Sequence, residues 1–197
     1  SDSFGFHDAL KFTEASWVAQ KQSELASWLK LNLGKMDLFR EKDSFYGDSD
    51  CPAYEYGYYL AQRTRNILSL GNKPIDSMWR LCSSLNIPYI CTELSHAIGG
   101  ATLAVGDLRC IVSNSEGYNS NEWVRRVTIA HELAHLLWDP HEQLLNLKID
   151  SYKDITEDGT TFSDYVEQRA NAFAAEFLIP SSSIRHQRND EDTNEYV

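Results

Sequence analysis

The sequence predicts an α+β fold, a helical domain with a small β-sheet in which an H-E-x-x-H motif lies between two buried helices. Residues 120–138 and 164–180 each carry apolar side chains at helical spacing, and each stretch ends at or beside a proline. Short apolar stretches between residues 87 and 112 are separated by glycine-containing pairs, which is typical of strands joined by turns. Together these patterns indicate one α+β core.

The chain divides into three segments. An N-terminal helical extension is expected over residues 1–50, because apolar residues run at helical spacing over residues 13–33 and Gly34 could end that helix. The main domain, which contains the motif, is expected over residues 51–180. A polar, acidic and mobile tail is expected over residues 181–197.

Within the main domain, helices are expected before the strands, and the strands before the motif. The expected helices cover residues 54–70 and 75–85, and the expected strands cover residues 87–92, 101–105 and 109–112. The pairs Gly99-Gly100 and Gly106-Asp107 are expected to be turns. Residues 139–162 include a polar stretch that is expected to cover or border a cleft.

His131, Glu132 and His135 form the H-E-x-x-H motif, the most informative feature of the chain. At roughly 100° per residue, the two histidines stand one turn apart on one helix face with Glu132 beside them. Two imidazoles can bind one Zn²⁺ while the carboxylate reaches a water on that ion. The flanking residues are apolar almost all round, which indicates a buried helix. Asn119 and Glu122 could form the capping box that starts it.

A catalytic zinc usually takes a third protein ligand, and two residues compete for this role. His141 completes the H-E-x-x-H-x-x-G-x-x-H spacing of metzincins. However, Trp138 stands where that pattern needs a glycine to turn the chain. Both methionines, Met36 and Met78, also precede the motif, whereas a metzincin has its Met-turn after it. The sequence therefore favours the second candidate, Glu167.

Glu167 lies on the apolar face of the helix expected over residues 164–180. Glu176 is expected on the opposite, solvent-exposed side together with Arg169, so it cannot share the site. A carboxylate on an apolar face is costly unless its charge is paired. The alternative to metal binding is therefore a salt bridge from Glu167 to a neighbouring arginine such as Arg126.

Two stretches carry a family resemblance. Residues 126–137 read R-V-T-I-A-H-E-L-A-H-L-L, and residues 167–180 read E-Q-R-A-N-A-F-A-A-E-F-L-I-P. They resemble the R-F-T-x-A-H-E-x-G-H-L-L and E-x-x-A-N-x-F-A-A-x-L-L-M-P patterns of the ImmA/IrrE family of zinc metallopeptidases. One departure is Ala134, where the family usually has glycine. Residues 111–114 resemble the family's edge strand before the motif helix, and the likeness covers about residues 55–180.

The resemblance implies that His131, His135 and Glu167 bind Zn²⁺ and that Glu132 is the general base. It also implies a regulatory endopeptidase that site-specifically cleaves a partner protein, a helix-turn-helix transcriptional repressor, in stress-response, mobile-element or phage-defence control. The alternative is a zinc-stabilised binding module that sequesters a partner without proteolysis. Glu132 distinguishes the two, because a structural zinc needs no base and is usually closed by four protein ligands. The sequence leaves four candidates for a side chain that stabilises the oxyanion: His96, His141, Tyr152 and Tyr165.

The composition indicates a cytoplasmic protein. Four cysteines without a C-x-x-C pairing read as free thiols in a reducing compartment. Cys91 or Cys110 could nevertheless occupy the open zinc position and silence the enzyme. A net charge of −11 argues against broad nucleic-acid binding, so nucleic acid is expected only as a regulator. The same negative charge suits a basic protein partner. No apolar run approaches the length of a membrane-spanning helix, so no membrane partner is expected.

Overall fold

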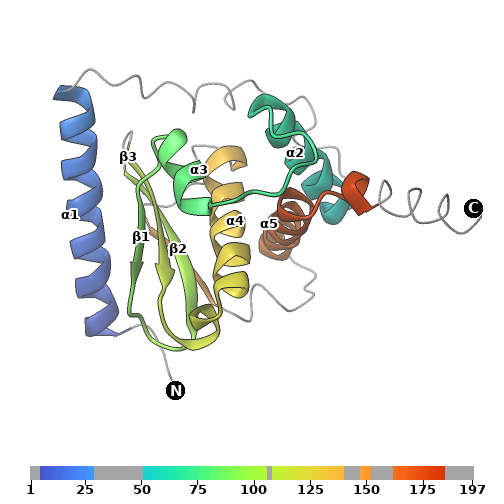
Figure 1. Cartoon of the computed structure of the whole chain (residues 1–197). Helices are drawn as coiled ribbons and strands as arrows, with labels where there is room; N and C mark the ends of the chain where they lie inside the picture. The colour runs from blue at the N-terminus through green and yellow to red at the C-terminus, as the bar shows by residue number, and fades with distance from the viewer. Residues whose placement is uncertain (1–4, 29–50, 106–107, 140–146, 152–161, 185–197) are drawn as a thin grey trace, which may run out of the picture.

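The computed structural model describes residues 5–28, 51–105, 108–139, 147–151 and 162–184. It confirms the α+β class, with helices on both faces of one small sheet (Figure 1). The helices are α1 (Phe6–Trp28), α2 (Ala53–Ile67), α3 (Met78–Ser84), α4 (Glu122–Trp138) and α5 (Phe162–Leu178), with a 3₁₀ turn η2 (Gly117–Ser120) before α4. The strands are β1 (Tyr89–Thr92), β2 (Ile98–Val105), β3 (Leu108–Asn114) and β4 (Leu147–Ser151).

The expected helices are found with shifted ends. The N-terminal helix begins at residue 6 instead of residue 13 and is described as far as residue 28, whereas residues 29–33 and Gly34 lie outside the described residues. The helix expected from residue 75 begins only at Met78, because the Ser77 hydroxyl accepts a hydrogen bond from the Arg80 N–H (3.3 Å) and caps it. Among the helices that the structure describes, none is both long and apolar enough to cross a lipid bilayer.

The strands form one sheet in the order β1-β3-β2-β4. β1 runs parallel to β3, and β2 runs antiparallel to both β3 and β4. Two expectations are wrong here. Residues 111–114 belong to β3, which lies inside the sheet instead of at its edge, and Gly99-Gly100 lie within β2 instead of in a turn. β4 was not expected from the sequence, and it pairs with β2 alone among the described strands.

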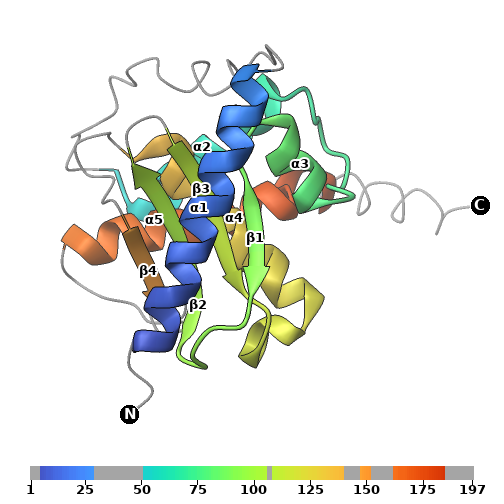
Figure 2. The same ribbon diagram turned by 90° about the vertical axis from the view of Figure 1, so that its left-hand side faces the viewer.

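Each face of the sheet is covered by a different helix layer. α1 packs on one face, where Phe12, Ala15 and Ala19 join an apolar cluster with residues of β2 and β3 (Figure 2). α4 packs on the other face, and α5 and α2 lie beyond it (Figure 1). Asp8 anchors the start of α1, because its carboxylate accepts hydrogen bonds from the backbone N–H and the hydroxyl of Ser95 (2.8 and 2.6 Å).

The start of α4 differs from the expected capping box. Asn121 is the N-cap, and its side chain accepts a hydrogen bond from the Trp123 N–H (2.9 Å). Asn119 is instead buried in η2, where its amide donates to the Gly99 carbonyl (2.7 Å) and accepts from the Thr128 hydroxyl (2.9 Å). This amide ties β2 to the first turns of α4, so it holds the motif helix against the sheet.

Gly57 lies where α2 and α5 approach each other closely. A Cβ added there would collide with the backbone carbonyl of Arg169 and would lie 2.8 Å from the Cβ of Ala172. We expect Gly57→Ala to lower the free energy of unfolding by about 1–3 kcal/mol, because α5 would have to move. Urea unfolding measures this change. Asn66→Ala, at an exposed position of the same helix, should change it by less than about 0.5 kcal/mol. Equal unfolding midpoints for the two variants would contradict this packing.

Candidate metal centre

α4 carries the two motif histidines into the interior. Residues 128–138 are all buried, because the sheet covers one side of α4 and α5 packs on another. His131 and His135 are both fully buried, and their Nε2 atoms lie 3.1 Å apart. The two rings therefore present their Nε2 atoms to the same small region, as the i, i+4 spacing predicts.

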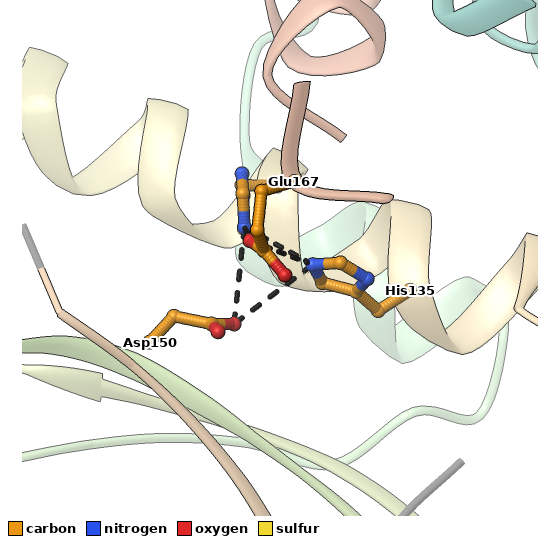
Figure 3. A group of neighbouring side chains, drawn as sticks. His135, Asp150 and Glu167 are labelled. Carbon is orange, nitrogen blue, oxygen red and sulfur yellow. Dashed lines mark hydrogen bonds and ion pairs between the residues drawn. The ribbon is translucent and has the colours of Figure 1, made fainter. Parts of the chain in front are cut away.

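Glu167 reaches the histidines from α5, and Asp150 reaches them from β4 (Figure 3). Glu167 Oε2 lies 3.1 Å from His131 Nε2 and 3.6 Å from His135 Nε2. Asp150 Oδ2 lies 3.8 and 3.9 Å from the same two nitrogens. One donor atom from each of the four residues lies within 4.8 Å of the others. The structure thus brings together the three residues expected as ligands and adds Asp150, which the sequence analysis missed.

This donor group fits a tetrahedral metal ion such as zinc. With metal–ligand distances near 2.0–2.1 Å, neighbouring ligand atoms of a tetrahedral site lie roughly 3.3 Å apart. The five distances to the histidine nitrogens given above run from 3.1 to 3.9 Å, and all four donor atoms lie within 4.8 Å of one another. Asp150 Oδ2 and both oxygens of Glu132 are buried and accept no hydrogen bond from any described residue. A bound ion and its water would supply partners to these atoms.

Outer partners orient both imidazole rings. His135 Nδ1 is hydrogen-bonded to Asp139 Oδ2 (2.9 Å), and Arg169 forms an ion pair with the other oxygen of Asp139. His131 Nδ1 donates a hydrogen bond to Asn171 Oδ1 (2.8 Å). Hydrogen bonds at Nδ1 leave each Nε2 available for a metal, which is the arrangement common to metal-binding histidines.

The face of α5 that was expected to meet solvent is buried as well. Arg169 and Glu176 are 2% and 5% exposed, because α2 packs extensively against α5. Glu176 accepts hydrogen bonds from Gln62 Nε2 of α2 (3.2 Å) and from the Ser181 N–H (3.1 Å). The expected exposure of this face is therefore wrong, although Glu176 takes no part in the donor group around His131.

Glu132 is enclosed between α4 and β2. Gly100 of β2 faces it so closely that a Cβ there would lie 2.6 Å from Glu132 Oε1. Burial, together with the nearby negative charge of Asp150, raises the pKa of Glu132 well above its ordinary value. A carboxyl group in this environment binds a proton more readily than one in water, which suits a group that takes up a proton during a reaction.

Lys148 of β4 contributes a positive charge to the site. Its Nζ lies 2.5 Å from Glu167 Oε1, 2.8 Å from His135 Nε2 and 3.2 Å from Asp150 Oδ1. Burial alone would raise the pKa of Glu167, but the hydrogen bonds to His131 and His135 and the Lys148 charge hold it well below its usual range. The Lys148 ammonium group lies next to His135 Nε2 and Glu167, where a metal would bind, so metal binding requires Lys148 to move.

The other ligand candidates do not join this group. Arg126, the alternative partner of Glu167, donates instead to two backbone carbonyls just before α3. Cys91 is exposed and Cys110 is buried in the apolar cluster beneath α1, so neither thiol reaches the donor atoms. The idea that one of these cysteines silences the site is therefore wrong. His141 lies outside the described residues.

Two of the four candidates for stabilising the oxyanion, His96 and Tyr165, lie in the described part of the chain. His96 is exposed, and the Tyr165 hydroxyl donates a hydrogen bond to the Cys51 carbonyl (3.1 Å). His141 and Tyr152, the remaining candidates, lie outside the described residues.

The pH dependence of metal binding follows from His135. Burial lowers the pKa of an imidazole, but the Asp139 carboxylate outweighs burial and raises the pKa of His135 from 6.5 to about 9. Only the neutral imidazole binds a metal, so we expect the zinc affinity to rise roughly tenfold per pH unit, up to about pH 9. Chelator competition measures this profile.

Asp139→Asn provides the comparison for the pH profile. It removes the charge that raises the pKa of His135, so the zinc affinity should level off at a lower pH than in the wild type. A wild-type affinity that already levels off near pH 6.5 would contradict this role of Asp139.

Residues 117–197 match the family model Peptidase_M78, described as the IrrE N-terminal-like domain. The matched region includes α4, β4 and α5, which carry the whole donor group and Glu132. The match confirms the resemblance to the ImmA/IrrE family and indicates a domain of metallopeptidase type. The chain has no match among the curated proteins with which it was compared.

Proposed function

We propose that this chain is a zinc-dependent endopeptidase that cleaves a partner protein at a specific site. The observation that carries the proposal is Glu132, a fully buried carboxyl group that accepts no hydrogen bond from any described donor and lies beside two histidines and two further carboxylates. Such a group is costly to bury unless something pairs with it. A water held between Glu132 and a metal would do so, and the family match over residues 117–197 supports the same reaction class.

In this proposal His131, His135 and Glu167 bind the ion, and Glu132 is the general base. A bound zinc supplies Lewis acidity, which activates water and polarises the scissile carbonyl. Glu132 takes a proton from the attacking water on one of its carboxylate oxygens and delivers it to the leaving amine as the C–N bond breaks. Gly100 leaves room for the Glu132 side chain, so the β2 backbone holds the base in position.

The alternative, a zinc-stabilised binding module, is favoured by one observation. Asp150 offers the site a fourth donor from the protein, and four protein ligands are typical of structural zinc. Glu132 favours catalysis instead, because a buried carboxyl group that accepts no hydrogen bond would only destabilise a purely structural zinc site. Proteolysis accounts for both the donor group and Glu132, whereas binding alone accounts only for the donors.

A DNA-binding transcriptional repressor is the proposed substrate, in stress-response, mobile-element or phage-defence control. The resemblance to the ImmA/IrrE family implies this class of partner, and the net charge of −11 suits the basic face of a DNA-binding protein. β4 pairs with β2 alone among the described strands and carries Lys148 and Asp150 at the site. An extended substrate segment could therefore add beside β4 as a further strand.

Cleavage assays with the zinc-loaded protein test the proposal. We expect new chain termini, detected by mass spectrometry, at one site in one member of a panel of helix-turn-helix repressors, and none after a chelator removes the zinc. Cleavage of unstructured peptides in general would indicate a broad-specificity peptidase instead. A repressor that binds tightly and stays intact would favour the binding module.

A further inference from the structure

We propose that Asp150 is a fourth protein ligand, which closes the coordination of the metal in this conformation and must withdraw before hydrolysis. The inference rests on the proposed metal site of His131, His135 and Glu167. It gives β4 a direct role in the chemistry of the site, which neither the H-E-x-x-H motif nor the family resemblance assigns to it.

The Asp150 side chain points into the donor group (Figure 3). It is 3% exposed, its Oδ2 atom accepts no hydrogen bond from a described donor, and its carboxylate lies beside the carboxyl group of Glu132. The same oxygen lies 3.8 Å from His131 Nε2 and 3.9 Å from His135 Nε2. The other oxygen, Oδ1, pairs with Lys148 at 3.2 Å. One oxygen thus faces Lys148, and the other faces the place where the ion would bind.

The sheet register explains why Asp150 faces the site. Asp150 pairs with Gly100 across the antiparallel β2–β4 ladder, and directly paired residues present their side chains on the same face. Gly100 has no side chain, and Glu132 Oε1 lies where its Cβ would otherwise meet it. Asp150 from β4 and Glu132 from α4 therefore converge above the Gly100 backbone, next to the histidines.

Coordination by Asp150 and general-base catalysis by Glu132 require different coordination of the ion. A tetrahedral zinc with four protein ligands has no position for water, whereas general-base catalysis requires one. The other ligands lie on α4 and α5, and β4 is paired only with β2 among the described strands. A shift of β4 would withdraw Asp150 and break the Lys148 contacts to Glu167 and His135, while those two ligands stay on α5 and α4. With Asp150 on the metal the site is latent, and withdrawal of β4 opens it to water.

Replacing Asp150 by cysteine tests direct coordination. With Co²⁺ in place of zinc, a cobalt–thiolate bond gives a near-ultraviolet charge-transfer band that nitrogen and oxygen ligands do not give. We expect this band in Co²⁺-loaded Asp150→Cys but not in the wild type, whose own cysteines lie outside the donor group. Ser151→Cys is the matched control, because successive residues of a strand point to opposite faces, and it should lack the band.

The zinc affinity of Asp150→Asn provides a second readout that does not depend on activity. We expect a loss larger than the roughly 10–100-fold typical of outer partners of a metal site. Circular dichroism checks that the variant is folded. Asp76→Asn makes the same chemical change at an exposed carboxylate outside the donor group, and it should leave the affinity unchanged.

The outcomes separate this inference from the proposed function. Absence of the charge-transfer band in Co²⁺-loaded Asp150→Cys, with unchanged zinc affinity in Asp150→Asn, would overturn the role of Asp150. If Glu167→Gln still weakens binding in that case, the proposed metal site stands. If the wild type binds neither ion, the proposed function itself fails. If Asp150→Cys does not fold, the zinc affinity of Asp150→Asn alone decides whether Asp150 is a ligand.

Discussion

Glu132→Gln should abolish cleavage while leaving the zinc in place. The glutamine amide has the same shape but cannot accept a proton, so we expect the cleavage rate to fall by roughly 10²–10⁴-fold, the typical contribution of general acid–base catalysis. The metal content should not change, because Glu132 is not among the four donors. The free energy of unfolding should not fall either, because the substitution removes an unpartnered buried carboxylate.

The cleavage assay on the repressor panel, run beside metal analysis and urea unfolding, measures all three quantities. Glu122→Gln is the matched control, since this glutamate lies exposed at the start of the same helix and should keep full activity. A Glu132→Gln protein that still cleaves at the wild-type rate would falsify the assignment of the base. Loss of zinc in this variant would mean that Glu132 binds the ion.

The second large effect is expected at the third ligand. Glu167→Gln should lower the zinc affinity by more than the roughly 10–100-fold typical of outer partners, because it removes an anionic oxygen 3.1 Å from His131 Nε2. His141→Ala should retain zinc, because four described residues already supply donor atoms for a tetrahedral ion. Zinc content per chain after dialysis against a weak chelator measures both variants, and circular dichroism shows whether each is folded.

Glu176→Gln is the matched control on the same helix, because Glu176 is also buried but bonds to Gln62 and Ser181 instead of the histidines. It should bind zinc as the wild type does. If His141→Ala loses zinc and Glu167→Gln keeps it, the α5 ligand is wrong and the metzincin-like spacing is the correct interpretation of the motif.

Local periodicity was sufficient to predict the parts of the site that lie on helices. His131 and His135 come from one helix, so their 3.1 Å separation follows from the i, i+4 spacing and the burial of its flanks. Glu167 stands on the apolar face of α5, and its position beside the histidines follows once α4 and α5 pack together. Both helices also lack helix-breaking residues over their length, so their ends were found within a few residues.

Asp150 was missed because the burial of charged residues depends on partners far along the chain. β4 reads L-K-I-D-S, a short alternation that is typical of a strand with one polar face toward solvent. In the structure that polar face meets the histidines and Glu167, so Lys148 pairs with Glu167 of α5 and Asp150 lies beside Lys148 and the histidines of α4. No pattern within five residues contains this information.

The exposure of α5 was predicted wrongly for a related reason. A helix with polar residues opposite its apolar face is normally half exposed, which is why Arg169 and Glu176 were expected in water. α2 covers that face, and each charged residue has a specific partner there, Asp139 for Arg169 and Gln62 for Glu176. Asn119 is a similar case. Its side chain donates a hydrogen bond to the Gly99 carbonyl of β2, and this contact could not be predicted without knowing where Gly99 lies in the fold.

The position of β4 also bears on how long an ion stays bound. The donors on α4 and α5 are largely enclosed, and Asp150 covers them from the sheet side, so an ion leaves only after some part of this enclosure opens. A strand with a single neighbour opens more readily than two helices packed in the core. Zinc release should then be a first-order process whose rate does not depend on chelator concentration. The residence time of the ion would then report the rate at which β4 opens and the Asp150–metal bond breaks.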